Sequence, residues 1–187
     1  MNGDADVAAL RRRVERIAAV LARDAGHDPG QQQLLETHIS IVLLSGGHAW
    51  KFKKPVDLGF ADFSTLARRR HLCGEELRLN RRFAPSLYEA VVTVTGTQDE
   101  PRLAADTDVA DAEASGGVID YAVRMRRFSR DEMLDALVAA DAVSIEEVET
   151  LVDDVASFHD RTERVPAGDR RGSAALVTEQ VEGALEG

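Results

Sequence analysis

The run His48-Ala49-Trp50-Lys51-Phe52-Lys53-Lys54-Pro55 decides how the middle of this chain is interpreted. It contains all three lysines of the 187 residues, and the other basic side chains are arginines. Apolar and charged residues alternate, which is typical of a β-strand with the aromatic residues on one face and Lys51 and Lys53 on the other. An ammonium approaches a phosphate as a compact point charge. Two interpretations follow: a strand whose lysine binds an anion, or a charged strand edge that discourages aggregation.

The patterns on either side predict the neighbouring elements. Residues 34–45 resemble strand material with a turn at 37–40, and Ser45-Gly46-Gly47-His48 is a strong hairpin signal. Ser64 can cap a helix that carries Glu75 and Glu76, with Arg68-Arg69-Arg70 as a solvated face. Residues 88–95 and 118–125 are further strand candidates. Residues 99–117 are rich in Asp, Ala and Gly and are predicted to be mostly loop.

Helices are predicted at both ends of the chain. Apolar residues recur at helical spacing from Val7 to Leu21, and the segment 26–30 with its Gly and Pro residues ends that helix. A short helix is predicted over 131–140. Ser144 with Glu147 has the capping-box pattern and starts a longer helix, and a last helix begins near Ser173.

Composition and charge exclude several classes of protein. The net charge of −10 is uneven: residues 131–187 carry 4 basic and 15 acidic side chains, and residues 51–130 carry 14 and 12. This is not the basic domain of a nucleic-acid binder. No run approaches the ~20 apolar residues of a membrane span, and no secretory signal is visible, so a cytoplasmic protein is predicted. The lone Cys73 excludes an internal disulfide, and the five histidines lack metal-ligand spacing.

The order of the elements favours a nucleotide-binding fold. A glutamate on the helix after the lysine strand can anchor an ammonium so that it contacts the α- and β-phosphates of a nucleotide. The predicted class is therefore α+β: an antiparallel sheet with a glutamate-bearing helix, as in the small lobe of a protein-kinase-like fold, followed by the first helices of a large lobe. The predicted domains are an N-terminal helix (1–30), the small lobe with its hinge (31–128) and an incomplete helical large lobe (129–187).

Five motifs in this order also resemble a known family. They are Glu36-Thr37-His38-Ile39-Ser40, Ala49-Trp50-Lys51-Phe52-Lys53-Lys54-Pro55-Val56, Gly59-Phe60-Ala61-Asp62-Phe63-Ser64-Thr65-Leu66, Glu75-Glu76-Leu77-Arg78-Leu79-Asn80-Arg81-Arg82 and Asp120-Tyr121-Ala122-Val123-Arg124-Met125-Arg126-Arg127-Phe128. Together they resemble the aminoglycoside phosphotransferase-like domain of a bacterial family, many members of which fuse it to a C-terminal P-loop ATPase or kinase domain. The resemblance runs from about Gln33 to His159 and covers only the N-terminal part of that domain.

The resemblance implies ATP as the cofactor and assigns residues to its binding. Lys53 becomes the main phosphate-contacting lysine, with Lys51 as the alternative, and its partner is Glu76 or Glu75. Residues 37–40, with His38 and Ser40, take the place of a phosphate-covering loop, although they lack glycine. Met125, Arg126 and Arg127 take the place of the hinge, whose backbone groups bind an adenine edge.

The residues for the chemical step are missing. Phosphoryl transfer of this type needs an Asp for the attacking hydroxyl, and an Asn and a second Asp for magnesium, all after the long helix. The asparagines of the chain are Asn2 and Asn80, so no Asn follows the pair His159-Asp160. No catalytic residue and no metal ligand are therefore predicted, and Mg²⁺ would bind only with the missing portion.

The chain is therefore expected to be an incomplete phosphotransferase-like domain, inactive alone and binding ATP weakly or not at all. The alternative is a non-catalytic nucleotide-binding or regulatory interaction module. The expected partners are a nucleotide, the missing large lobe or a downstream P-loop domain, and a second copy of the chain through exposed helices.

Overall fold

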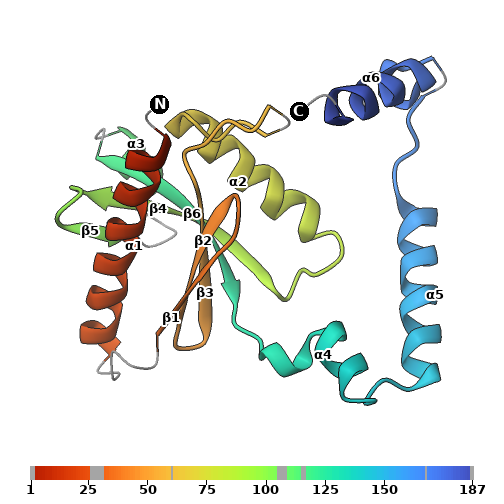
Figure 1. Cartoon of the computed structure of the whole chain (residues 1–187), viewed down its shortest axis with the longest axis horizontal. Helices are drawn as coiled ribbons and strands as arrows, with labels where there is room; N and C mark the ends of the chain where they lie inside the picture. Colours follow the sequence, from red (N-terminus) through yellow and green to blue (C-terminus); the bar gives the residue numbers. More distant parts are fainter. Residues whose placement is uncertain are drawn as a thin grey trace. The chain divides into compact units, whose positions relative to one another are not determined.

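The computed structural model describes residues 3–25, 32–59, 61–104, 109–114, 117–166 and 168–185. The fold is α+β, as predicted, with a curled six-stranded antiparallel sheet and several helices (Figure 1). The chain divides into two compact units, Met1–Phe128 and Ser129–Gly187. Among the described helices, none is both long enough and apolar enough to cross a membrane.

The sheet belongs to the first unit and has the strand order β1-β2-β3-β6-β4-β5. Its strands are β1 (Gln33–Glu36), β2 (Ser40–Ser45), β3 (His48–Lys53), β4 (Tyr88–Gly96), β5 (Pro101–Leu103) and β6 (Val118–Arg126). The predicted hairpin joins β2 to β3, and Gly46 in its turn has φ 54°, a conformation that glycine adopts without steric cost. The lysine strand β3 pairs with β2 on one side and β6 on the other, so the interpretation of a charged strand edge is wrong.

Two helices cover opposite faces of this sheet (Figure 1). Helix α1 (Gly3–Ala25) buries Leu10, Val14 and Ile17 against one face, where Trp50 and Phe52 also point. Helix α2 (Leu66–Asn80) packs Cys73 against Tyr121 and Val123 on the other face. Because strand side chains alternate, the lysines of β3 point toward α2. The segment 26–30, predicted to end the first helix, lies outside the described residues.

The range 99–117, predicted to be mostly loop, also contains β5 and the short helix α3 (Val109–Ala114), and β5 pairs with the end of β4. The predicted cap of α2 was wrong. The cap of α2 is Thr65, whose hydroxyl accepts a hydrogen bond from the Arg68 amide at 3.2 Å. Ser64, the predicted cap, instead donates its hydroxyl to Asp62 at 2.6 Å.

A buried ion cluster joins the two helices at Asp120 of β6. One carboxylate oxygen accepts hydrogen bonds from Nε of Arg69 on α2 at 2.8 Å and from the Tyr121 amide at 2.9 Å. The other oxygen accepts from Arg13 on α1. Asp120 is only 2% exposed, and burial lowers the pKa of Arg13 although Asp120 opposes that shift. The prediction of a solvated arginine face at 68–70 is thus wrong for Arg69, which is buried to hold this carboxylate.

The described elements of the second unit are helical: η3 (Arg130–Glu132), α4 (Leu134–Ala139), α5 (Ile145–Arg161), η4 (Arg170–Gly172) and α6 (Ala174–Leu185). The capping box predicted at Ser144 and Glu147 is confirmed, since each residue bonds the backbone amide of the other. None of the described side chains in this unit is buried. Residues 129–187 carry 5 basic and 15 acidic side chains, and residues 1–128 carry 18 of each. The whole net charge therefore lies in the second unit.

Candidate functional site

The candidate site consists of two ammonium groups that share one carboxylate. Lys51 and Lys53 project from β3 toward α2, where Glu76 lies. Lys51 Nζ donates to Oε1 of Glu76 at 2.8 Å, and Lys53 Nζ donates to Oε2. Strand alternation puts both lysines on one face, and helix α2, held on that face by Cys73 and Arg69, presents the glutamate to them.

The structure distinguishes the two glutamates that the sequence left open. Glu76 is held by the lysines, whereas Glu75 points away and pairs with Arg78 one helical turn later, at 2.6 Å. Burial alone would raise the pKa of Glu76, but the hydrogen bonds and charges of the two lysines outweigh it, so the pKa of Glu76 is lowered. The glutamate is therefore ionised in the folded protein at neutral pH.

The two lysines differ in their access to solvent. The Lys53 side chain is 5% exposed, and its ammonium lies 5.5 Å from the ring centroid of Phe63, which covers it. The Lys51 side chain is 26% exposed. Of the two side chains, that of Lys51 is therefore the more accessible to an anion in solvent. These exposures favour Lys51 as the ligand-contacting residue, in contrast to the order inferred from the resemblance.

The segment 37–40, expected to cover phosphates, is a tight turn between β1 and β2. The Ser40 amide donates to the Thr37 hydroxyl at 3.0 Å, so this amide is not available to a phosphate. Ser40 is buried and stands opposite Lys53 in the strand register, and its hydroxyl makes no hydrogen bond with the described residues. His38 is exposed at the tip of the turn. The third lysine, Lys54, pairs with Glu36 at 2.7 Å and stays outside the shared-carboxylate cluster.

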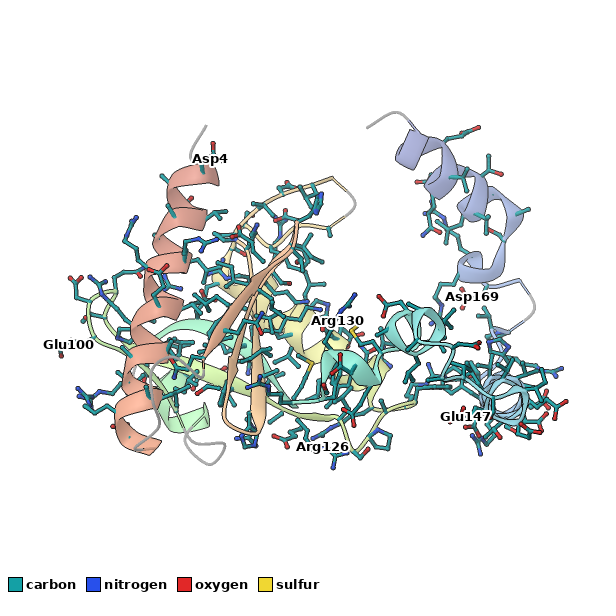
Figure 2. All side chains as sticks on the ribbon, turned by 60° about the horizontal axis from the view of Figure 1, so that its bottom comes forward. Asp4, Glu100, Arg126, Arg130, Glu147 and Asp169 are labelled. Atoms are coloured by element: carbon teal, nitrogen blue, oxygen red, sulfur yellow. The ribbon has the colours of Figure 1, made fainter. Side chains whose placement is uncertain are left out.

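The expected hinge is largely occupied by the sheet itself. Met125 is within β6, paired in register with Ala49. The Arg126 amide donates to the Leu87 carbonyl at 2.9 Å, and the Arg127 amide donates to the Gly47 carbonyl at 2.8 Å. Both amides are therefore engaged within the fold, and the expected adenine contacts of residues 125–127 stay a prediction. The side chain of Arg126 is exposed at the end of the strand (Figure 2).

A pocket that the sequence did not predict lies along the flank of α2 that carries Ala67 and Gly74. It is open, has a volume of about 530 Å³, and is lined by Ala67, Gly74, Val91 and Tyr121 among others. At its edge Glu113 accepts two hydrogen bonds from Arg70 and one from the Tyr121 hydroxyl. Burial, and then this bond, raise the pKa of Tyr121 to about 12. The spacing of Ala67, Arg70, His71 and Gly74 along one helical flank was the available signal.

The residues that the structure describes give little support for metal binding or for a cysteine nucleophile. No group of three or more His, Cys, Asp and Glu side chains in those residues is placed to hold a metal ion. Cys73 is buried, and burial raises the pKa of its thiol to about 12. A thiol with that pKa is not a nucleophile at neutral pH. Asp57 and Asp62 accept hydrogen bonds from the amides of Gly59 and Ser64, which is the behaviour of loop and cap residues.

The shared carboxylate makes stability depend on pH. The pKa of Glu76 in the folded protein lies below its ordinary value of 4.5, so its stabilising contribution is present above about pH 4.5 and is lost as the pH falls through the lowered value. We expect the difference in unfolding free energy between wild type and Glu76→Gln to narrow as the pH falls from about 6 to about 3. Urea unfolding across this range measures it. A difference that stays constant with pH would contradict the lowered pKa.

Comparison with known proteins finds relatives of undetermined function. The chain is 30% identical over 142 residues to uncharacterized proteins of Mycobacterium bovis and Mycobacterium tuberculosis. The match covers 76% of this chain and 25% of each relative, so the chain spans about a quarter of their length. No family model matches the chain. No solved structure matches it either.

Proposed function

We propose that the first unit is the nucleotide-binding small lobe of a protein-kinase-like phosphotransferase, of the aminoglycoside phosphotransferase-like kind. The observation that carries this proposal is the Lys51–Glu76–Lys53 cluster, an interior-strand lysine pair anchored by a glutamate on the next helix. An anchored ammonium of this kind positions the phosphates of ATP for transfer to a small-molecule acceptor.

The charge of the cluster supports an anionic ligand. Two ammonium groups face one ionised carboxylate, so the cluster carries one surplus positive charge. The surrounding residues are partly buried, which strengthens the attraction between this charge and an incoming phosphate. Lys51 has the exposed surface to meet it, while Lys53 keeps Glu76 in place from beneath Phe63.

The residues fit one end of ATP better than the other. Lys51 fits the phosphates, but the Arg126 and Arg127 amides are engaged within the fold and do not fit an adenine edge. The described residues contain no metal-holding group, so no step through Mg²⁺ is assigned to this chain. The catalytic Asp, Asn and magnesium Asp would come from another segment, as in a longer protein of the length of the relatives.

Nucleotide binding by the purified chain tests this function. We expect Lys51→Ala to weaken binding of a non-hydrolysable ATP analogue by at least about tenfold, because the only accessible ammonium of the cluster is removed. Isothermal titration calorimetry measures the affinity. The matched control is Lys54→Ala, which removes a lysine paired with Glu36 outside the cluster and should leave the affinity within about twofold. Equal losses in both variants would show non-specific attraction to positive charge.

A second candidate function is a non-catalytic nucleotide-binding or regulatory module. The burial of Lys53 under Phe63 and the engaged amide of Ser40 favour it, because both limit how closely phosphates can approach. The two functions differ in one outcome. A phosphotransferase lobe gains turnover when the missing catalytic segment of a longer relative is supplied, and a module binds nucleotide or a partner without turnover.

A further inference from the structure

Helix α5 carries an apolar stripe whose N-terminal part is exposed to solvent. The stripe consists of Ile145, Val148, Leu151 and Val152, which recur at the i, i+3 and i+4 spacing of one helix face. Ile145 is 65% exposed and Leu151 is 43% exposed. Figure 2 views the helix nearly along its axis, near Glu147, with side chains projecting around it. Such a face normally packs against another element.

The described residues of the unit form no buried core beneath this part of the stripe. None of its described side chains is buried, and Leu134, Val138, Val177 and Val181 on the neighbouring helices are also exposed. Helices of this length gain most of their stability from packing of an apolar face. A unit with apolar stripes and no buried side chain among its described residues is therefore suited to form its core with a partner.

Charge restricts what that partner can be. Glu149 lies one turn from both Ile145 and Val152, and Asp154 lies one turn from Leu151, so carboxylates border the stripe on both sides. The unit has a net charge of −10 over 59 residues. Apposition of two copies would bring these acidic borders together, and like charges across an interface are unfavourable. A face bordered by Lys or Arg would pair with them.

We propose that the α5 stripe is the docking surface for a basic amphipathic helix, one whose apolar face is bordered by lysine or arginine. The apolar stripes pack together, and Glu149 and Asp154 select the partner through its basic border. The stripe belongs to the second unit, and its proposed role does not depend on nucleotide binding.

Two synthetic helices of about 20 residues test the proposal on the full chain. Both carry the same leucine stripe; one has lysines along its borders and the other has glutamates. We expect the lysine-bordered helix to bind at least about tenfold more tightly in calorimetry, and to weaken as salt rises from ~50 to ~300 mM. Leu151→Asp should abolish binding of both. Hydrogen exchange should show α5 becoming protected when the lysine-bordered helix is added.

Charge reversal distinguishes selection of the partner helix by Glu149 and Asp154 from a general electrostatic attraction between the acidic unit and a basic helix. In the double variant Glu149→Lys/Asp154→Lys, the preference should switch to the glutamate-bordered helix, whereas Asp131→Lys/Asp135→Lys, in the same unit but before α5, should leave it unchanged. An unchanged preference in the first variant would overturn the proposal. If the chain alone forms a dimer that Leu151→Asp dissociates, the occupant of the stripe is a second copy of the chain. If hydrogen exchange shows strong protection of α5 in the chain alone, the chain covers its own stripe. Either result also overturns it.

Discussion

Asp120→Asn should destabilise the first unit by about 3–5 kcal/mol, the largest effect we expect from a single polar substitution in this protein. The carboxylate is almost fully buried and is the charge partner of both Arg13 and Arg69. Its loss leaves two guanidinium groups in the interior without a counter-charge. These two groups would then repel each other without solvation by water, which lowers the unfolding free energy by more than the lost attraction to Asp120 alone. Urea unfolding of the wild type and the variant measures the difference.

The matched control for this substitution is Asp99→Asn. Asp99 also pairs with an arginine of α1, Arg16, at 2.8 Å, but its side chain is 82% exposed. Loss of that pair should change the unfolding free energy by less than about 1 kcal/mol. If the two aspartate variants unfold at the same urea concentration, Asp120 does not hold the buried arginines in the way described.

Glu76→Ala should destabilise the fold by about 2–4 kcal/mol, because it leaves the Lys53 ammonium buried without its carboxylate. The expected cost is smaller than for Asp120, since the second ammonium, Lys51, is partly solvated. Glu75→Ala is the neighbouring control. That residue contacts Arg78 at the surface, so its loss should leave the midpoint of urea unfolding close to that of the wild type.

A second substitution identifies the origin of the Glu76→Ala cost. If the cost comes from the unpaired ammonium, then Glu76→Ala/Lys53→Met should be more stable than Glu76→Ala alone, since the methionine is uncharged and fits under Phe63. Non-additivity of this kind measures the interaction between the two side chains. A double variant that is less stable than Glu76→Ala would instead assign the cost to packing of the glutamate side chain against α2 and β3.

The sequence predicted the lysine strand well because a strand has a period of two. Alternation alone placed Trp50 and Phe52 on one face and the lysines on the other, and the structure confirms both faces. The hairpin was equally predictable, since two glycines between alternating segments readily adopt the positive φ that a two-residue hairpin turn requires. The choice between Glu75 and Glu76 was not, because adjacent helix positions are separated by 100° and only the packing of α2 fixes which one faces the sheet.

The features that the sequence did not reveal depend on residues far apart in the chain. Arg69 was expected on a solvated face, because nothing near it indicates a buried partner; Asp120 lies 51 positions later. Access to the lysines also depends on such contacts, since Phe63 covers Lys53 only after the connection between β3 and α2 folds back. The strand β5 was missed because three residues starting with a proline give almost no periodic signal.

The Asp120 cluster has a mechanical consequence for the first unit. Its two carboxylate oxygens are divided between the layers, one bound to Arg13 of α1 and the other to Arg69 of α2. A rotation of α1 about its own axis would pull on the same carboxylate that restrains α2, and α2 carries Glu76 two turns beyond Arg69. Because the N-terminal helix and the helix that carries Glu76 share this carboxylate across the sheet, we expect a displacement of either helix to alter the contacts of the other.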